Sequence, residues 1–236
     1  ESGTGRLYEK GWGFQGTVRS FRRRILCGTG YVDIDIEQSQ LNVIRFILED
    51  AEEQGLPVPE DLIPFFQDIT ESKQFRDQMQ ADLQIPKGVA KELIYSMVFG
   101  GRPEYHMSEV RAGLQELLQP GEVERICSGA TNRLLPIRKA VSWIIETARS
   151  GMEINDWYCI NEGNLTNRAG KRISLREKPR RIAAFLIQGA EANETAKMTV
   201  RLFEAGILPI ANFHDGILLY PNGMHSFQHI MTRDRK

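Results

Sequence analysis

An acidic stretch, Asp33-Ile34-Asp35-Ile36-Glu37, has the residue types and the spacing of a divalent-cation site. The alternation places Asp33 and Asp35 on one face of a strand, together with Glu37 if the strand extends that far. Carboxylates crowded on one edge repel one another unless a cation neutralises them. The stretch therefore predicts a cation site, or else a solvent-facing edge strand.

A second acidic position lies in His214-Asp215-Gly216, between the apolar segments 210–213 and 217–220. Asp-Gly is a common hairpin dipeptide, so a plain turn accounts for it when it is considered alone. Considered together with Asp35, Asp215 predicts two carboxylates on neighbouring short strands. Such a pair could hold two Mg²⁺ ions about 4 Å apart, which is the arrangement that promotes in-line displacement of pyrophosphate.

Four residues within 86–99 recur at every fourth position and so line one face of an expected helix: Lys87, Lys91, Tyr95 and Phe99. Ammonium groups near the N-terminal end of a helix suit a triphosphate, because the helix dipole also favours anions there. Aromatic rings further along the helix offer flat surfaces on which a base can stack. The alternative is a solvated lysine face with both rings in the core.

Hydrophobic spacing predicts the elements that hold these residues. A period of two over 31–36 indicates a half-buried strand, and three- and four-residue steps over 38–53 indicate an amphipathic helix. Further helices are expected within 65–84, over 86–99 and across 105–160. We expect the last of these stretches to be broken near Pro120-Gly121 and near Gly151.

The remainder of the chain changes character. We expect a turn-rich basic segment over 161–181, then a turn at Gln188-Gly189 and a long helix from there to about Gly206. A hairpin over 207–220 closes the pattern. The order of strand, many helices and hairpin predicts an α+β fold, in which distant segments form a small antiparallel sheet and the largely helical part is an insertion.

Composition limits the classes of protein. The 236 residues carry 30 basic and 31 acidic side chains, a net charge of −1, so any basic groove must be local. One candidate is 168–181, where seven Lys and Arg accompany a single acid. These cations predict contact with a nucleic-acid backbone, whose affinity would fall with salt, or else a solvated loop.

Targeting signals are not evident. No run approaches the roughly 18 apolar residues of a membrane helix, so no membrane partner is expected. Three scattered cysteines without CxxC spacing predict a reducing compartment. We expect the cytoplasm, with a bacterial, phage or other mobile-element origin, or a reducing organelle matrix, and not secretion.

The motifs together resemble the polymerase domain of family A DNA polymerases, the bacterial polymerase I type. The segment 35–41 is similar to the family's motif A, Lys91 with Tyr95 and Phe99-Gly100 to motif B, and His214-Asp215 to motif C. Supporting segments occur in the family's order at Thr4-Gly5-Arg6-Leu7 with Gln15, at Gly170-Lys171-Arg172, and over 181–189.

This resemblance implies template-directed addition of dNTPs to a primer 3′-end by two-metal phosphoryl transfer, with Mg²⁺ as cofactor and Mn²⁺ as a possible substitute. The implied metal ligands are Asp35, Asp215 and the backbone carbonyl of Ile36. The implied nucleotide contacts are Lys91, which would also protonate pyrophosphate, and Lys87, Tyr95, Phe99, Gln40 and Ile36. The implied nucleic-acid contacts are Arg6, Gln15, Arg172, Arg181, Gln188 and His214.

Two other alignments of the acidic ligand are possible. Setting Ser39-Gln40 on the family's Ser-Gln pair would place Glu37 in the ligand position, and Asp33 is a reserve ligand. Asp35 is preferred because the family has an Asp at that position.

Several positions depart from the family pattern. Gly216 replaces the Glu that follows the motif C Asp, so reduced activity is expected. Gln40 replaces the Glu that blocks a ribose 2′-hydroxyl, and Phe99 replaces a Tyr. These two changes predict a preference for dNTPs with weaker discrimination of the sugar. Tyr95 is the residue associated with accepting nucleotides that lack a 3′-hydroxyl.

The resemblance also predicts a division into domains. Residues 1–50 and 161–236 would form the palm, and 51–160 would form the fingers, including the motif B helix at 86–101. The thumb and exonuclease domains would be absent. We therefore expect a fragment, half of a split polymerase, or a divergent minimal viral or mobile-element enzyme.

The expected partners are primer–template DNA and dNTPs, with a separate thumb or exonuclease subunit as a further candidate. Two alternatives stay open. One is a relative of the single-subunit RNA polymerases, and the other is a catalytically silent nucleic-acid-binding module that keeps the fold.

Overall fold

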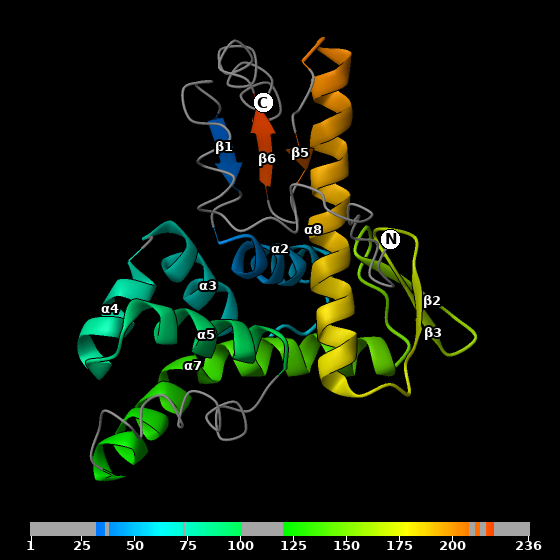
Figure 1. The fold of residues 1–236 in the computed structure, drawn as a ribbon. Helices are drawn as coiled ribbons and strands as arrows, with labels where there is room; N and C mark the ends of the chain where they lie inside the picture. The colour runs from blue at the N-terminus through cyan, green and yellow to red at the C-terminus, as the bar shows by residue number, and fades with distance from the viewer. Residues whose placement is uncertain are drawn as a thin grey trace.

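The computed structural model describes residues 32–35, 38–72, 74–100, 120–207, 211–212 and 216–219. Figure 1 shows the elements in chain order: β1 (Val32–Asp35), α2 (Ser39–Glu53), α3 (Leu62–Glu71), α4 (Phe75–Leu83), α5 (Lys87–Val98), α7 (Pro120–Arg149), β2 (Tyr158–Asn161), β3 (Asn164–Asn167), β4 (Arg172–Ser174), α8 (Pro179–Glu204), β5 (Ala211–Asn212) and β6 (Gly216–Leu219). The predicted α+β fold is confirmed. Within these described ranges, no helix is both long enough and apolar enough to cross a membrane.

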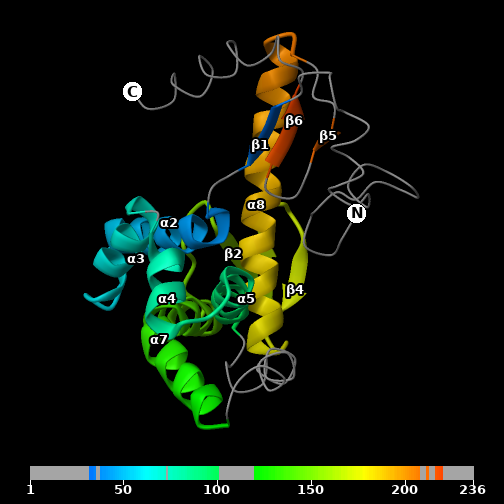
Figure 2. The same ribbon diagram turned by 60° about the vertical axis from the view of Figure 1, so that its left-hand side comes forward.

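Strand β1, near the start of the chain, pairs with β6, near its end. The sheet order is β1-β6-β5, and both pairings are antiparallel. The register sets Val32 opposite Leu219 and Asp35 opposite Gly216. In both views the sheet stands beside the C-terminal half of α8 (Figures 1 and 2). The small sheet expected from distant segments is thus present.

The helix expected over 38–53 is α2. Its apolar residues at three- and four-residue steps face the core, where Ile44, Ile47 and Leu48 are at most 1% exposed. The stretch 65–84 holds two helices, α3 and α4, rather than one. Phe65 packs edge-on against Phe75 of the following helix, with ring centroids 5.9 Å apart.

Helix α5 begins directly after Pro86, as the sequence predicts, and ends before Gly100, whose φ of +69° suits glycine. Helix α7 is described from Pro120 to Arg149, and Gly151 follows with a φ of +85°, so the break expected near Gly151 is confirmed. The part of the predicted helical stretch before Pro120 lies outside the described residues.

The segment 161–181 holds the predicted turns and bends, at 162–163, 168–170 and 175–177, but it also contains strands that the sequence did not predict. Strands β2, β3 and β4 form a second antiparallel sheet there. Asn161 lies opposite Asn164, and the two residues between them, Glu162 and Gly163, both have positive φ, at 50° and 75°. Positive φ at both central residues is the requirement of a type I′ turn, which closes a tight hairpin.

The prediction of a turn at Gln188-Gly189 is wrong, because α8 continues through both residues. The glycine serves close packing instead. A Cβ on Gly189 would lie 2.5 Å from the Cγ of Asn167, which occupies that space. Asn167 donates from Nδ2 to the carbonyl oxygen of Phe185 at 2.9 Å. The side chain therefore fastens the second sheet to α8.

Helix α8 takes part in two hydrophobic clusters. Its N-terminal half, including Ile182 and Phe185, packs in the large cluster formed with α2, α3, α5 and α7. Its C-terminal half packs in a smaller cluster, in which Met198 and Leu202 meet Ile217 and Leu219. The helix therefore connects the β1-β6-β5 sheet to the helical body, which Figure 2 shows below the sheet.

Candidate functional site

The register of β1 and β6 brings the acidic strand beside the segment that follows motif C. Asp35 lies opposite Gly216, and opposed Cα atoms in antiparallel strands are about 4.5–5.5 Å apart. Asp35 is thus a close neighbour of the residue that follows Asp215 in the sequence. At this edge of the sheet, the predicted positions Ile36, Glu37, His214 and Asp215 lie outside the described residues.

The turn between β1 and α2 is conformationally unusual. Gln38 has φ 51° and ψ 36°, a left-handed conformation that costs a non-glycine residue about 1–2 kcal/mol. Its Oε1 is buried and, among the described residues, has no hydrogen-bond partner. Backbone strain and unpaired buried polar atoms both concentrate at functional sites. The turn after the acidic strand is therefore a candidate for contact with a ligand.

The next two residues begin α2 and are buried. Ser39 Oγ donates a hydrogen bond to Glu191 Oε1 of α8 at 2.5 Å. Gln40, the predicted sugar gate, is 8% exposed. The start of α2 is consequently fixed against α8, and Gln40 is held with little freedom.

On the predicted face of α5, the exposure of the side chains decreases from the start of the helix to its end. Lys87 and Lys91 are exposed, whereas Tyr95 and Phe99 are half-buried. Lys87 Nζ lies 2.9 Å from Asp77 Oδ1 of α4, and this ion pair lowers the pKa of Asp77. Lys91 Nζ lies 5.2 Å from the centroid of the Tyr95 ring. The two lysines therefore have different partners.

Phe99 at the end of this face packs against the large hydrophobic cluster. The alternative of a core role thus holds for Phe99. Tyr95 keeps part of its ring exposed beside Lys91, as a stacking surface requires.

The predicted nucleic-acid contacts are distributed over β4 and α8. Arg172 is exposed on β4, and Gln188 is half-buried in the middle of α8. Arg181 is exposed and donates from Nη1 to both carboxylate oxygens of Glu177 at 2.9 Å. The other three predicted contacts with the duplex, Arg6, Gln15 and His214, lie outside the described residues.

Cations of the basic segment do not all face solvent freely. Arg168 lies over the Trp157 ring, 4.3 Å from its centroid, and pairs with Glu194 at 3.4 Å. Trp157 in turn donates from Nε1 to Asp50 of α2 at 2.5 Å. These contacts give Arg168 a structural role between the second sheet, α2 and α8.

Glu191 is a buried acid that sequence reasoning did not single out. It is 1% exposed and accepts the Ser39 hydrogen bond. The available signal was its spacing, because Glu191 falls four residues after Ile187 and seven before Met198, on the buried face of α8. A charged residue on an apolar helix face is uncommon unless it has a specific partner.

A metal site cannot be assembled from the described residues alone. Within those ranges, no group of three His, Cys, Asp or Glu side chains comes together to hold an ion. Ile36 and Asp215, the other predicted ligands, lie outside them. The metal ligands accordingly stay a prediction.

This architecture, a small antiparallel sheet joined to a helical body by one long helix, is polymerase-like. A similar solved structure is the POL domain of Pol1 from M. smegmatis in complex with DNA primer-template and dNTP. The two chains share a TM-score of 0.57 and 16% identity over 97% of this chain, which spans 42% of the length of that chain. Pol1 is a family A DNA polymerase. No family model and no curated protein matches this chain by sequence.

Proposed function

We propose that the chain carries out template-directed DNA synthesis, in which the 3′-hydroxyl of a primer attacks the α-phosphorus of a dNTP and pyrophosphate leaves. The observation that carries the proposal is the pairing of β1 with β6, which sets Asp35 opposite the residue after Asp215. The fold shared with a polymerase domain supports it, as does the order of the motifs.

The donor set fits a divalent cation. Carboxylates and a backbone carbonyl are the hard oxygen ligands that Mg²⁺ prefers, and the buried, unpaired Oε1 of Gln38 is a further oxygen at this end of the strand. In the proposal Asp35, Asp215 and the carbonyl of Ile36 hold Mg²⁺ or Mn²⁺. When bound, the ions would stabilise the negative charge of the reacting phosphoryl group.

The remaining steps belong to side chains of α5 and α2. Lys91 would bind the triphosphate and give a proton to the departing pyrophosphate, while Lys87 adds positive charge. Because Lys91 lies over the Tyr95 ring, its movement to a triphosphate would uncover that ring for stacking on the incoming base. Gln40, fixed at the start of α2, would limit the space beside the sugar, and Phe99 is the second residue predicted to contact the nucleotide there.

Duplex contacts in this proposal come from Arg172, Arg181 and Gln188, with Arg6, Gln15 and His214. The palm would comprise 1–50 and 161–236, and the fingers 51–160. A thumb or exonuclease subunit is a further candidate partner.

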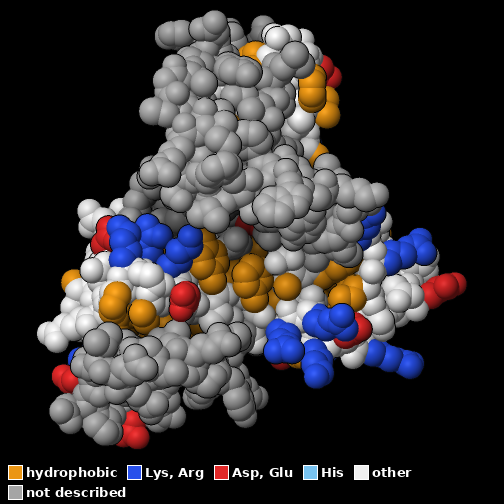
Figure 3. Space-filling view, viewed as in Figure 1, with side chains coloured by type: hydrophobic (Ala, Val, Ile, Leu, Met, Phe, Trp, Pro, Cys, Tyr) orange, Lys and Arg blue, Asp and Glu red, His pale blue; other side chains and the backbone are white. Residues whose placement is uncertain are grey.

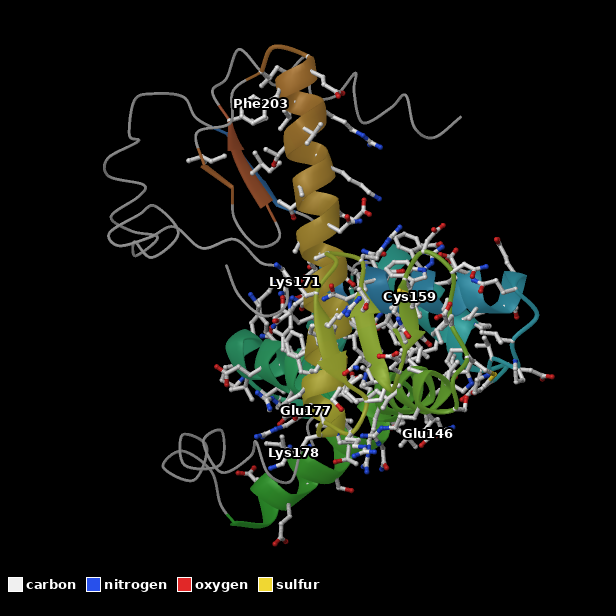
Figure 4. All side chains as sticks on the ribbon, turned by 90° about the vertical axis from the view of Figure 1, so that its right-hand side faces the viewer. Glu146, Cys159, Lys171, Glu177, Lys178 and Phe203 are labelled. Carbon is white, nitrogen blue, oxygen red and sulfur yellow. The ribbon has the colours of Figure 1, made fainter. Side chains whose placement is uncertain are left out.

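Primer extension with Mg²⁺ or Mn²⁺ tests the proposal. Wild type should extend a primed DNA template, and Asp215→Ala should abolish extension. Glu146→Gln, an exposed acid on α7 (labelled in Figure 4), is the matched control and should extend the primer as wild type does. Parallel reactions with dNTPs and rNTPs should show faster incorporation of dNTPs.

Two outcomes would count against this view. Extension by Asp215→Ala would show that the metal ligands are misassigned. Absence of extension in every variant, with primer–template binding intact, would favour the catalytically silent module.

A further inference from the structure

A cavity of about 370 Å³ lies where α5, α7 and the start of α8 meet. Its walls include Gly100 at the end of α5, Arg138 and Ser142 of α7, and Lys178 and Arg180 at the start of α8. Figure 3 shows Lys and Arg side chains gathered over the lower end of α8, and Figure 4 labels Lys178 there, beside α7. The cavity is therefore rimmed by cations from two helices.

Arg138, Lys178 and Arg180 take part in no ion pair with any residue that the structure describes, whereas their sequence neighbours Lys139 and Arg181 do. The nearby carboxylate of Glu177 is engaged by Arg181.

Three cations that line one open cavity repel one another, and the repulsion is stronger where solvent is excluded. An anion in the cavity would remove that repulsion. The N-terminal end of α8 adds a favourable dipole.

The walls of the cavity are fixed before any ligand arrives. Arg149 of α7 donates to the carbonyl oxygens of Leu175 and Glu177, at 3.2 and 2.8 Å, and so holds the segment that carries Lys178. A Cβ on Gly100 would lie 3.4 Å from the Cα of Arg180, so the end of α5 packs closely against the start of α8. A preorganised site of this kind loses little entropy on binding.

We propose that this cavity is a binding site for a phosphate group, with Arg138, Lys178 and Arg180 as its ligands. Arginine and lysine are the side chains that bind phosphate oxygens, and Ser142 supplies a hydroxyl. The volume exceeds that of one phosphate, and the apolar side chains of Val141 and Ile145 form part of the wall. The phosphate can thus arrive attached to a sugar or a neighbouring nucleotide.

Two sources offer this chemistry, namely a backbone phosphate of single-stranded nucleic acid and a free nucleotide. The backbone source rests on the proposed function, whereas phosphate binding itself does not. Sequence reasoning placed Lys178 and Arg180 in a basic segment, but it did not associate them with Arg138, which lies 40 residues earlier in the chain.

Equilibrium binding to the full chain tests the site, with a fluorescein-labelled 12-nucleotide oligo-dT and labelled dTTP as separate probes. Arg138→Gln and Arg180→Gln should each weaken binding of one probe about tenfold, the loss expected for one charge-assisted contact. For the oligonucleotide, each substitution should also reduce the salt slope by about 0.7. Arg125→Gln, which removes an exposed cation of the same helix outside the cavity, is the matched control and should change binding less than about twofold.

The two probes distinguish a strand backbone from a free nucleotide as the source of the phosphate, and the variants test the proposed site itself. A loss confined to the oligonucleotide assigns the site to a strand backbone, and a loss confined to dTTP assigns it to a nucleotide. Wild-type binding of both probes by both variants would overturn the proposal, as would an equal loss in Arg125→Gln. If either arginine variant fails to fold by circular dichroism, Lys178→Gln replaces it, because that side chain is exposed. Primer extension by the same wild-type protein is measured separately, so failure of catalysis is distinguishable from failure of phosphate binding.

Discussion

The two lysines of α5 are one helical turn apart, yet their surroundings differ. Lys87 is neutralised by Asp77, and both side chains are more than half exposed. Lys91 has no acidic partner among the described residues and rests over an aromatic ring. An ammonium that carries no counter-charge is better suited to receive a triphosphate. The structure therefore distinguishes two residues that the sequence pattern treats alike.

We expect Lys91→Ala to lower kcat/KM for dNTP incorporation about 100-fold, because an interaction with the developing pyrophosphate charge is lost. Lys87→Ala should lower it about tenfold at most, since Asp77 already neutralises that charge. Single-nucleotide incorporation kinetics measure both values. Asp77→Asn, which releases Lys87, should lower KM for the dNTP. Equal losses in the two lysine variants would contradict this ranking.

Among the elements, those with a strong period were predictable from sequence and those fixed by tertiary contacts were not. The apolar steps of α2 and the Pro86 start of α5 determine these helices locally. In β3, only Leu165 and Asn167 are buried, so the short strand has no apolar alternation. Its signal was the two-residue turn at Glu162-Gly163.

The same distinction applies to the candidate site. Apolar segments flanking acidic residues predict that β1 and β6 are strands, and the motif resemblance predicts that they meet. The Ser39–Glu191 hydrogen bond and the cluster of Arg138 with Lys178 join residues far apart in the chain. No local pattern encodes such contacts.

The packing of β3 on α8 leads to a prediction for Gly189. We expect Gly189→Ala to destabilise the chain by about 2–4 kcal/mol, because the new methyl group displaces Asn167 and its buried hydrogen bonds. Urea unfolding measures the change. Gly121→Ala, where a methyl group meets nothing within 4 Å, is the control and should be neutral or slightly stabilising.

A double variant distinguishes the mechanism. Adding Asn167→Ala to Gly189→Ala should recover part of the loss, since the two sites then no longer collide. If the two losses simply add, the steric explanation is wrong.

The buried phenol of Tyr158 makes the stability of the whole molecule depend on pH in the alkaline range. Burial raises the pKa of Tyr158, and Glu153 raises it further. Its hydroxyl donates to the carbonyl oxygen of Met152 at 3.1 Å. Because the folded pKa is the higher one, the stability contribution is complete below the unfolded value of about 10. It is lost as pH rises above that value, by about 1.4 kcal/mol per pH unit for this group.

Urea unfolding between pH 8 and 11 tests this linkage. Tyr158→Phe should be about 1 kcal/mol less stable at pH 8, because the hydrogen bond is lost. Its stability should fall less steeply than that of wild type above about pH 10, so the two curves approach each other. Parallel curves would show that Tyr158 does not control the alkaline transition.

The pairing of β1 with β6 has a consequence for biosynthesis. A ribosome must synthesise the whole segment from Val32 to Leu219 before these two residues can pair, whereas α2 to α5 contact one another through nearby segments. Contacts between remote segments form slowly because a large loop must close. The helical body can therefore organise while translation continues, and a prematurely terminated product would retain that body yet lack the strand that completes the acidic edge.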